Sequence, residues 1–325
     1  MPSLLSCCGA AGRSRSSTVG LTAHGLGAIL GVVAAGVTLV GQELSLGRRP
    51  PFRVGVDLTS VTVTVLDSEG RLVRGLGRER FELFEDSERQ GVTQFVSDRV
   101  PISLGVLLDT SDSMFGERIR DARMALDRFL FELLDREDEF ALFAFNHAPR
   151  LLTGWTADSA RVRSALNDLR PSGATAAYDA VIAALPLFES RHRQRAALLV
   201  ISDGADTASD ATIRDVPAAL LRSDAFVYAI AIDATTRQAI NSRVRPDTLR
   251  EITDPSGGRT EVVRSFDDLR DATARIAEEL SSQYLLGYSP SHGGDGKYHS
   301  IRVRVTGGDY RIRARSGYVA TNGRR

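Results

Sequence analysis

The chain has 325 residues, of which 42% are apolar and 25% charged, so it can bury a sizeable core and is not disordered by composition. Its 41 Lys and Arg residues balance its 41 Asp and Glu residues, which gives no electrostatic reason to expect nucleic acid as a partner. The only two cysteines, Cys7 and Cys8, are adjacent near the N-terminus and exclude both a disulfide framework and a cysteine metal site.

Residues 1–50 predict export. Arg13 and Arg15 precede an apolar run at residues 20–40, the pattern of a secretory signal peptide or an N-terminal membrane anchor. At about 21 residues, the run is long enough to span a bilayer if it is not cleaved. A buried helix is the alternative, but the run is rich in glycine and has no amphipathic stripe. With a linker at residues 47–51, the sequence predicts a periplasmic or extracellular protein, or one anchored to the membrane through residues 20–40.

An antiparallel β segment is expected at residues 51–100. Val61, Val63 and Val65 alternate with threonines at period two, which indicates a strand with one buried face. Two further short strands are expected at residues 81–84 and 92–95.

Strands alternate with helices at residues 101–283. Residues 102–108 and 196–201 are nearly continuous apolar runs, as expected of strands buried on both faces of a parallel sheet. Further strands are expected at residues 140–145, 151–156, 225–232 and 260–263, and helices at 119–133, 160–169, 177–188, 213–221 and 266–282. The alternation predicts an α/β domain with a doubly wound, mostly parallel sheet of Rossmann-like topology.

Period two returns at residues 284–319, where three strands are expected. Neither this segment nor residues 51–100 offers enough strands for a core of its own, since isolated hairpins are marginal in water. The two flanking segments are therefore expected to pair into one β-sandwich-like domain. Residues 320–325 would form a tail.

Oxygen-bearing side chains collect on three loops of the α/β domain. Asp109, Ser111 and Ser113 come directly after the first buried strand. Thr175 precedes a helix, and Asp203 follows the second buried strand. Ligands of open α/β sheets gather at the carboxyl ends of the strands, and hard cations such as Mg²⁺ prefer oxygen ligands. An N-cap cluster is the alternative for the first loop alone, but it does not account for the other two loops.

This set of residues resembles the metal-ion-dependent adhesion site (MIDAS) of von Willebrand factor type A (VWA) domains, and the resemblance covers residues 101–282. It implies that Ser111, Ser113 and Thr175 contact a metal ion directly or through water. Asp109 and Asp203 would act largely through bound waters and hydroxyls. Mg²⁺ is the expected ion, with Mn²⁺ or Ca²⁺ left open.

The flanking segments resemble those of bacterial exported VWA-related proteins. Asp112 stands where VWA domains often have Gly, which leaves the metal preference and the shape of the loop open. In the family, an acidic side chain of the partner completes the metal shell. The resemblance therefore implies metal-dependent protein binding, by an adhesion or scaffold module whose protein partner supplies an Asp or Glu.

Patterns typical of enzymes are missing from the sequence. There is no Gly-x-Ser-x-Gly hydrolase motif and no Gly-rich phosphate loop with Lys, and Ser111 stands where an aspartyl phosphatase would have its second Asp. A metal-assisted hydrolase stays the alternative, and it would need a base within reach of the metal. The sequence thus predicts a binding protein without catalytic residues.

Overall fold

The computed structural model describes residues 58–203, 206–233 and 246–321. The predicted signal or anchor at residues 20–40 and the linker that follows lie outside these residues, as does most of the predicted tail. Among the helices within the described ranges, none is both long and apolar enough to cross a membrane.

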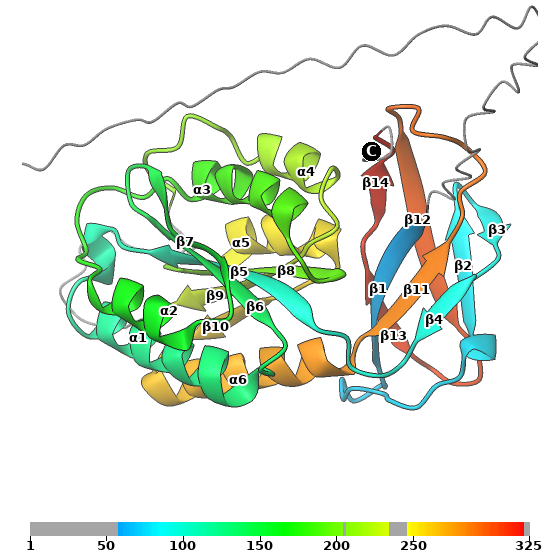
Figure 1. Cartoon of the computed structure of the whole chain (residues 1–325), viewed down its shortest axis with the longest axis horizontal. Coiled ribbons are helices and arrows are strands. Elements are labelled where there is room, and N and C mark those ends of the chain that lie inside the picture. Colours follow the sequence, from blue (N-terminus) through cyan, green and yellow to red (C-terminus); the bar gives the residue numbers. More distant parts are fainter. Residues whose placement is uncertain (1–57, 204–205, 234–245, 322–325) are drawn as a thin grey trace, which may run out of the picture. The chain divides into compact units, whose positions relative to one another are not determined.

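A six-stranded sheet forms the centre of the α/β region (Figure 1). Its strands are β5 (Ile102–Asp109), β6 (Glu139–Phe145), β7 (Pro149–Thr156), β8 (Arg195–Ser202), β9 (Phe226–Ile232) and β10 (Thr260–Val263). Their order is β10-β9-β8-β5-β6-β7, and all neighbours are parallel except β6 and the edge strand β7. Every residue of β5, β6, β8 and β9 is buried, which explains their largely apolar sequences.

Helices cover both faces of this sheet (Figure 1). One apolar core joins the sheet to α1 (Glu117–Arg128), α2 (Ser159–Asn167) and α6 (Phe266–Ser282). The core on the other face contains side chains of α3 (Ala177–Ala184), α4 (Asp215–Leu220) and α5 (Pro246–Thr253). The doubly wound, mostly parallel sheet predicted from the sequence is therefore confirmed.

Two helices end earlier than the sequence predicts. A single π turn, Phe129–Leu133, follows α1, and the 3₁₀ turn Leu185–Ser190 follows α3. Pro186 explains the second change, because proline lacks the N–H that would continue an α-helical ladder. The helix α5 was not predicted, although its buried residues Leu249, Ile252 and Thr253 have the i, i+3, i+4 spacing of a helix. It is only eight residues long, so the periodic signal is short.

The flanking segments form two four-stranded antiparallel sheets (Figure 1). One has the order β13-β1-β11-β4 and the other β14-β12-β2-β3. The N-terminal strands are β1 (Thr59–Leu66), β2 (Phe81–Glu85), β3 (Glu88–Gln90) and β4 (Gln94–Val96), and the C-terminal strands are β11 (Tyr284–Tyr288), β12 (Tyr298–Val305), β13 (Arg311–Ala314) and β14 (Gly317–Val319). Each sheet combines strands from both flanks, so the expected β-sandwich-like part is confirmed.

A shared apolar core holds the two antiparallel sheets together. Val61, Val63 and Val65 of β1 lie in the same core as Ile301 and Val303 of β12. Arg302 and Arg304 at outward positions of β12 are exposed, so the strand alternates as expected of a sheet with one solvent-facing side.

A buried carboxylate connects the α/β region to the sandwich. Glu279 of α6 is 1% exposed and accepts hydrogen bonds from Thr64 of β1 at 3.2 Å and Tyr228 of β9 at 2.9 Å. Its other oxygen lies 2.6 Å from Nη2 of Arg313 in β13. Removing one member of such a buried pair is strongly destabilising, so Glu279 links the stability of the two regions.

Candidate metal centre

The strand order places a topological switch point between β5 and β8. From β5 the chain proceeds outward to β6 and β7 on one side, and from β8 to β9 and β10 on the other. Asp109 ends β5, and Ser202 ends β8 immediately before Asp203. Ligands of doubly wound sheets bind at such a point, outside the carboxyl ends of the strands.

Asp109 is fixed by hydrogen bonds on both carboxylate oxygens. Its Oδ1 accepts the backbone N–H of Ser111 at 2.8 Å, and its Oδ2 accepts the hydroxyl of Ser202 at 2.6 Å. The side chain has no exposed surface. A carboxylate at the end of β5 is thereby tied to the end of β8, across the switch point.

The two serines of the first loop come together beside Asp109. Their hydroxyl oxygens lie 2.9 Å apart, with Ser111 buried and Ser113 half-buried. A short 3₁₀ turn, Asp112–Met114, curls the loop, and Gly116 takes a positive φ of 81° just before α1 begins. This turn brings the two neutral hydroxyls of Ser111 and Ser113 to one side of the loop, next to each other.

Thr175 lies on the adjoining loop, which is bonded to the first. The N–H of Asp112 donates to the carbonyl of Gly173 at 2.9 Å. Thr175 itself is 4% exposed; its N–H donates to the Thr207 hydroxyl at 3.0 Å, and its carbonyl accepts the Thr207 N–H at 2.8 Å. These contacts hold the backbone of the Thr175 loop on two sides.

Asp203 lies beside a positive charge that the sequence analysis missed. Its carboxylate is 3.7 Å from Nη1 of Arg118, and the same nitrogen donates to the carbonyl of Ser113 at 2.7 Å. Arg118 is 8% exposed and Asp203 1%. The available signal was the position of Arg118 in the first turn of the helix that follows the serine loop. The centre thus combines two buried carboxylates with one guanidinium.

The pKa of Asp109 is raised from 3.8 to about 6. Burial is the main cause, because it disfavours the charged carboxylate, and the negative charge of Asp203 adds to it. The hydrogen bonds from Ser202 and Ser111 act in the opposite direction. Two crowded, poorly solvated carboxylates with hydroxyl neighbours are a donor set that suits a hard divalent cation, which would favour the ionised form.

Two other acidic residues near the loops differ in their surroundings. Asp112 is exposed, as expected of a solvated loop carboxylate. Asp206 is only partly exposed, and its Oδ1 accepts the N–H of Ala177 at 2.7 Å and the hydroxyl of Ser209 at 2.6 Å. It therefore caps the N-terminus of α3, directly after the Thr175 loop.

Comparison with known proteins agrees with this architecture. Residues 104–205 match the family model of the von Willebrand factor type A domain, so this part of the chain is a VWA domain. No curated protein matches the sequence. The solved von Willebrand factor type A protein from Catenulispora acidiphila is similar over 82% of this chain and 74% of its own length, with 13% identity and a TM-score of 0.50.

Other solved bacterial proteins are similar over about half of the chain. The conserved hypothetical protein BatB from Bacteroides thetaiotaomicron is 19% identical over 55% of this chain and 97% of its own, with a TM-score of 0.46. The vWF domain of the type V pili tip protein Mfa5 from Porphyromonas gingivalis is 14% identical over 55% of this chain and 95% of its own, with a TM-score of 0.44. At these identities the likeness concerns the fold alone.

Proposed function

We propose that the VWA domain of this protein binds a divalent cation, with Mg²⁺ the expected ion, and uses it to capture an acidic side chain of a protein partner. The ligands would be Asp109, Ser111, Ser113, Thr175 and Asp203. The observation that carries the proposal is the convergence of buried Asp109, the paired serine hydroxyls and Asp203 at the switch point of the sheet. VWA domains often bind divalent cations through a MIDAS of this composition.

The charges of the centre favour an anionic partner. Asp109 and Asp203 together carry two negative charges when ionised, and Arg118 carries one positive charge. A divalent ion would therefore leave a net charge of about +1 in a poorly solvated place, where Coulomb attraction is much stronger than in water. When bound, the ion would supply a position for one more oxygen ligand. An Asp or Glu of a partner fits both the charge and the oxygen preference.

We place this function outside the cytoplasm. The basic leader and the apolar run at residues 20–40 support a signal peptide or membrane anchor, followed by a linker up to residue 50. The domain limits that go with this proposal are residues 101–283 for the VWA domain and residues 51–100 with 284–319 for the sandwich. A fusion of residues 1–50 to a reporter active only after export tests it, and an intact but silent cytosolic fusion would contradict it.

A capture experiment tests the binding function. The purified chain is immobilised and exposed to a membrane and envelope extract with Mg²⁺, then washed with chelator. Captured protein should elute with chelator and rebind when Mg²⁺ or Mn²⁺ is restored. Thr175→Ala should lower capture strongly and change the metal-free melting curve far less, because it removes a hydroxyl while the backbone hydrogen bonds of Thr175 to Thr207 remain. Asp112→Ala, which removes an exposed carboxylate of the same region, is the matched control.

A partner whose capture is indifferent both to chelator and to Thr175→Ala would overturn the proposed mechanism, even though the fold is that of a VWA domain. Metal-dependent turnover of ester or phosphate substrates by the purified chain would instead favour the hydrolase alternative.

A further inference from the structure

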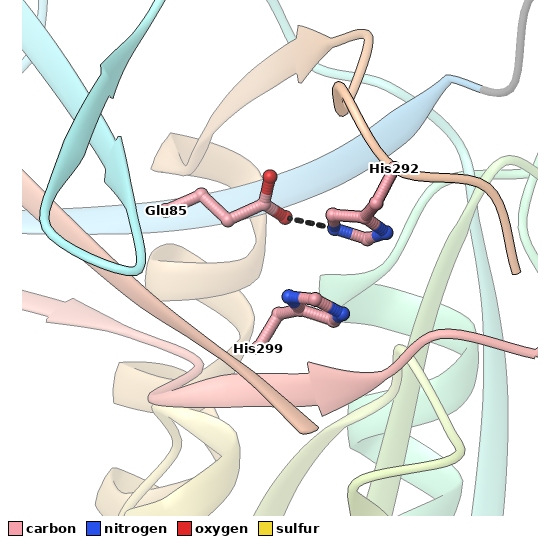
Figure 2. Close-up of side chains that lie close together, drawn as sticks. All are labelled: Glu85, His292 and His299. Atoms are coloured by element: carbon pink, nitrogen blue, oxygen red, sulfur yellow. Dashed lines mark ion pairs between the residues drawn. The ribbon is translucent and has the colours of Figure 1, made fainter. Parts of the chain in front are cut away.

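A second cluster of metal-binding side chain types lies in the sandwich, away from the VWA loops. Glu85 ends β2, His292 lies in the loop between β11 and β12, and His299 belongs to β12. One ligand atom from each of the three lies within 4.8 Å of the other two. Figure 2 shows the carboxylate of Glu85 at the edge of the His292 ring, with the His299 ring beneath it.

His299 has a carboxylate at each ring nitrogen. Its Nδ1 lies 2.7 Å from Asp86 and its Nε2 lies 3.1 Å from Asp295. Asp86 is held in place by the N–H of Ser300, which donates to its other oxygen at 2.8 Å. A carboxylate that accepts from one histidine nitrogen leaves the other nitrogen available as a ligand, which is the usual support of a metal-binding histidine.

The hairpin turn between β2 and β3 places Asp86 beside His299. Asp86 and Ser87 join β2 to β3 as a two-residue hairpin, and both have positive φ, 47° and 72°. Non-glycine residues rarely adopt such angles outside tight hairpin turns. The turn directs Asp86 back to His299 and β12, to which its side chain is bonded, although about half of that side chain stays exposed.

His292 is oriented in a similar way. Its Nδ1 lies 2.9 Å from the carbonyl of Gly293, which can only accept, so this nitrogen carries a proton. Its Nε2 then lies 3.2 Å from Oε1 of Glu85. That oxygen also accepts the hydroxyls of Tyr288 at 2.6 Å and Tyr318 at 2.8 Å, so the side chain of Glu85 is held in one position.

Each Nε2 atom therefore faces a carboxylate oxygen, and two lone pairs cannot face each other without a cation between them. That cation is a proton or a metal ion. Two protons would make both rings cationic, yet the rings stack with centroids 3.5 Å apart and planes 8° apart. Stacked imidazolium rings repel each other, whereas a metal ion bound at the ring edges leaves both rings neutral. Because the two planes are nearly parallel, one ring must tilt for both Nε2 atoms to reach the same ion.

We infer that Glu85, His292 and His299 form a second metal site, for Zn²⁺ or a similar borderline cation, with Asp295 available as a fourth ligand. Two imidazoles and carboxylate oxygens are typical zinc ligands, and Mg²⁺ prefers an all-oxygen set. The ion has a route in, because His292 and Tyr318 line a cavity of about 410 Å³. This site is independent of the function proposed for the VWA domain.

Cobalt spectroscopy on the full chain tests the inference. The chain is purified with a tag free of histidine, treated with chelator and titrated with Co²⁺, whose visible absorption reports nitrogen and oxygen coordination. One equivalent should bind with the intense band of a four-coordinate ion, and Zn²⁺ but not Mg²⁺ should remove the band. His292→Ala and Glu85→Gln should lose it, with at least about a tenfold weaker affinity.

Two controls separate this site from others. His192→Ala removes a histidine that also faces a carboxylate, Glu139 at 2.8 Å, but has no second histidine beside it, so the band should persist. Asp109→Ala should leave the band unchanged, since it alters only the VWA loops. Asp86→Asn should weaken binding about 10–100-fold without removing a ligand, as expected of a residue that positions His299.

A folded wild-type chain that binds no stoichiometric Co²⁺ or Zn²⁺ would overturn the inference and leave protons as the bridging cations. A band that survives in both His292→Ala and Glu85→Gln would overturn it as well. Circular dichroism of each variant distinguishes loss of the site from loss of the fold. If His292→Ala does not fold, Glu85→Gln, which keeps an oxygen acceptor for both tyrosines, decides the matter.

Discussion

The VWA loops and the sandwich each contain a buried carboxylate, and the two carboxylates are held in place by different groups. In the VWA loops, Asp109 is buried and oriented by a serine hydroxyl and a backbone N–H. In the sandwich, Glu85 is buried and oriented by two tyrosine hydroxyls. Both carboxylates are kept at a place where a cation is favourable, because an ionised group out of water needs a partner.

The neighbours of each carboxylate determine which cation fits. The VWA loops add hydroxyl oxygens from Ser111 and Ser113, a hard donor set without nitrogen. The sandwich adds the ring nitrogens of His292 and His299. Under the two proposals, ligand type rather than burial therefore separates the clusters, and we expect Mg²⁺ at the first and Zn²⁺ at the second. The following experiments perturb one cluster or the other, and the thermal melts compare the two directly.

Deleting the chain from Tyr284 onward should have the largest effect. β1 would lose both of its neighbours, β11 and β13, and β2 would lose β12. The N-terminal strands would then lack a cover, so residues 58–96 should become sensitive to protease, and Co²⁺ binding at the sandwich should vanish with His292 and His299. Limited proteolysis followed by mass spectrometry measures this. Equal resistance of residues 58–96 in the truncated and full chains would show that the flanks fold separately.

The second largest effect concerns thermal stabilisation by each metal ion, which a substitution in one cluster should remove for one ion only. Mg²⁺ at about 100 times its Kd should stabilise the chain by about 2.7 kcal/mol, which raises the melting temperature by several degrees. Asp109→Ala should abolish that rise and keep the response to Zn²⁺, whereas His292→Ala should do the reverse. Thermal melts with each ion measure both variants.

Asp112→Ala should behave as the wild-type chain with both ions. A single variant that loses both responses while remaining folded would show that the two clusters are coupled, and the comparison between them would fail.

A smaller effect concerns pH in the presence of chelator. The folded pKa of Asp109, about 6, lies above its ordinary value of 3.8, so the folded state binds more protons between these values. The contribution of Asp109 to stability is therefore fully present below about pH 4 and is lost as pH rises through about 6. The shift corresponds to at most about 3 kcal/mol.

Asp109→Asn removes this titration. Denaturant unfolding at pH 4.5 and 7.5 with chelator should show a smaller loss of stability in the variant than in the wild-type chain. An identical pH dependence in the two chains would mean that the carboxylate of Asp109 is better solvated than its burial indicates.

The sequence was sufficient for the α/β region because its signals are local. Strands such as Ile102–Asp109 are buried on both faces and appear as continuous apolar runs. The carboxyl ends of such strands meet at one edge, so Asp109 and Asp203 could be placed together from their positions alone. Arg118 was missed because its role depends on how α1 leaves the serine loop, at the positive φ of Gly116.

The histidine cluster was not predictable in the same way. Glu85 and His299 come from opposite flanks of the chain and meet only through the pairing of β2 with β12. His292 lies in an irregular loop, where no periodicity fixes the direction of a side chain. The spacing of Asp295 and His299, four residues apart, was the one local hint, and in a strand-and-loop segment it does not imply a shared face.

The smallest predicted effect comes from the charge of Arg118. Its guanidinium lies 3.7 Å from Asp203, where it competes with a metal ion for the same carboxylate. Replacing it with Met keeps much of the apolar stem and removes the charge, so Mg²⁺ affinity should rise, by roughly a fewfold to tenfold. The lost bond to the carbonyl of Ser113 acts in the other direction. We expect the charge to dominate, since the loop is also held by the hydrogen bond from the N–H of Asp112 to Gly173.

The same substitution should weaken the binding of a partner's carboxylate. Without the guanidinium of Arg118, the net charge of the metal-loaded centre falls from about +1 to about 0. Arg118→Met would thus bind metal more tightly and partner less tightly, a split that general destabilisation of the loop cannot produce. Calorimetric titration with Mg²⁺ measures the first effect, and metal-dependent capture measures the second. Arg120→Met, on the same helix but exposed and paired with Glu117, is the control that should change neither. A fall in the affinities for both Mg²⁺ and the partner would mean that the main role of Arg118 is to hold the Ser113 loop. The net charge proposed for this centre would then not determine its binding.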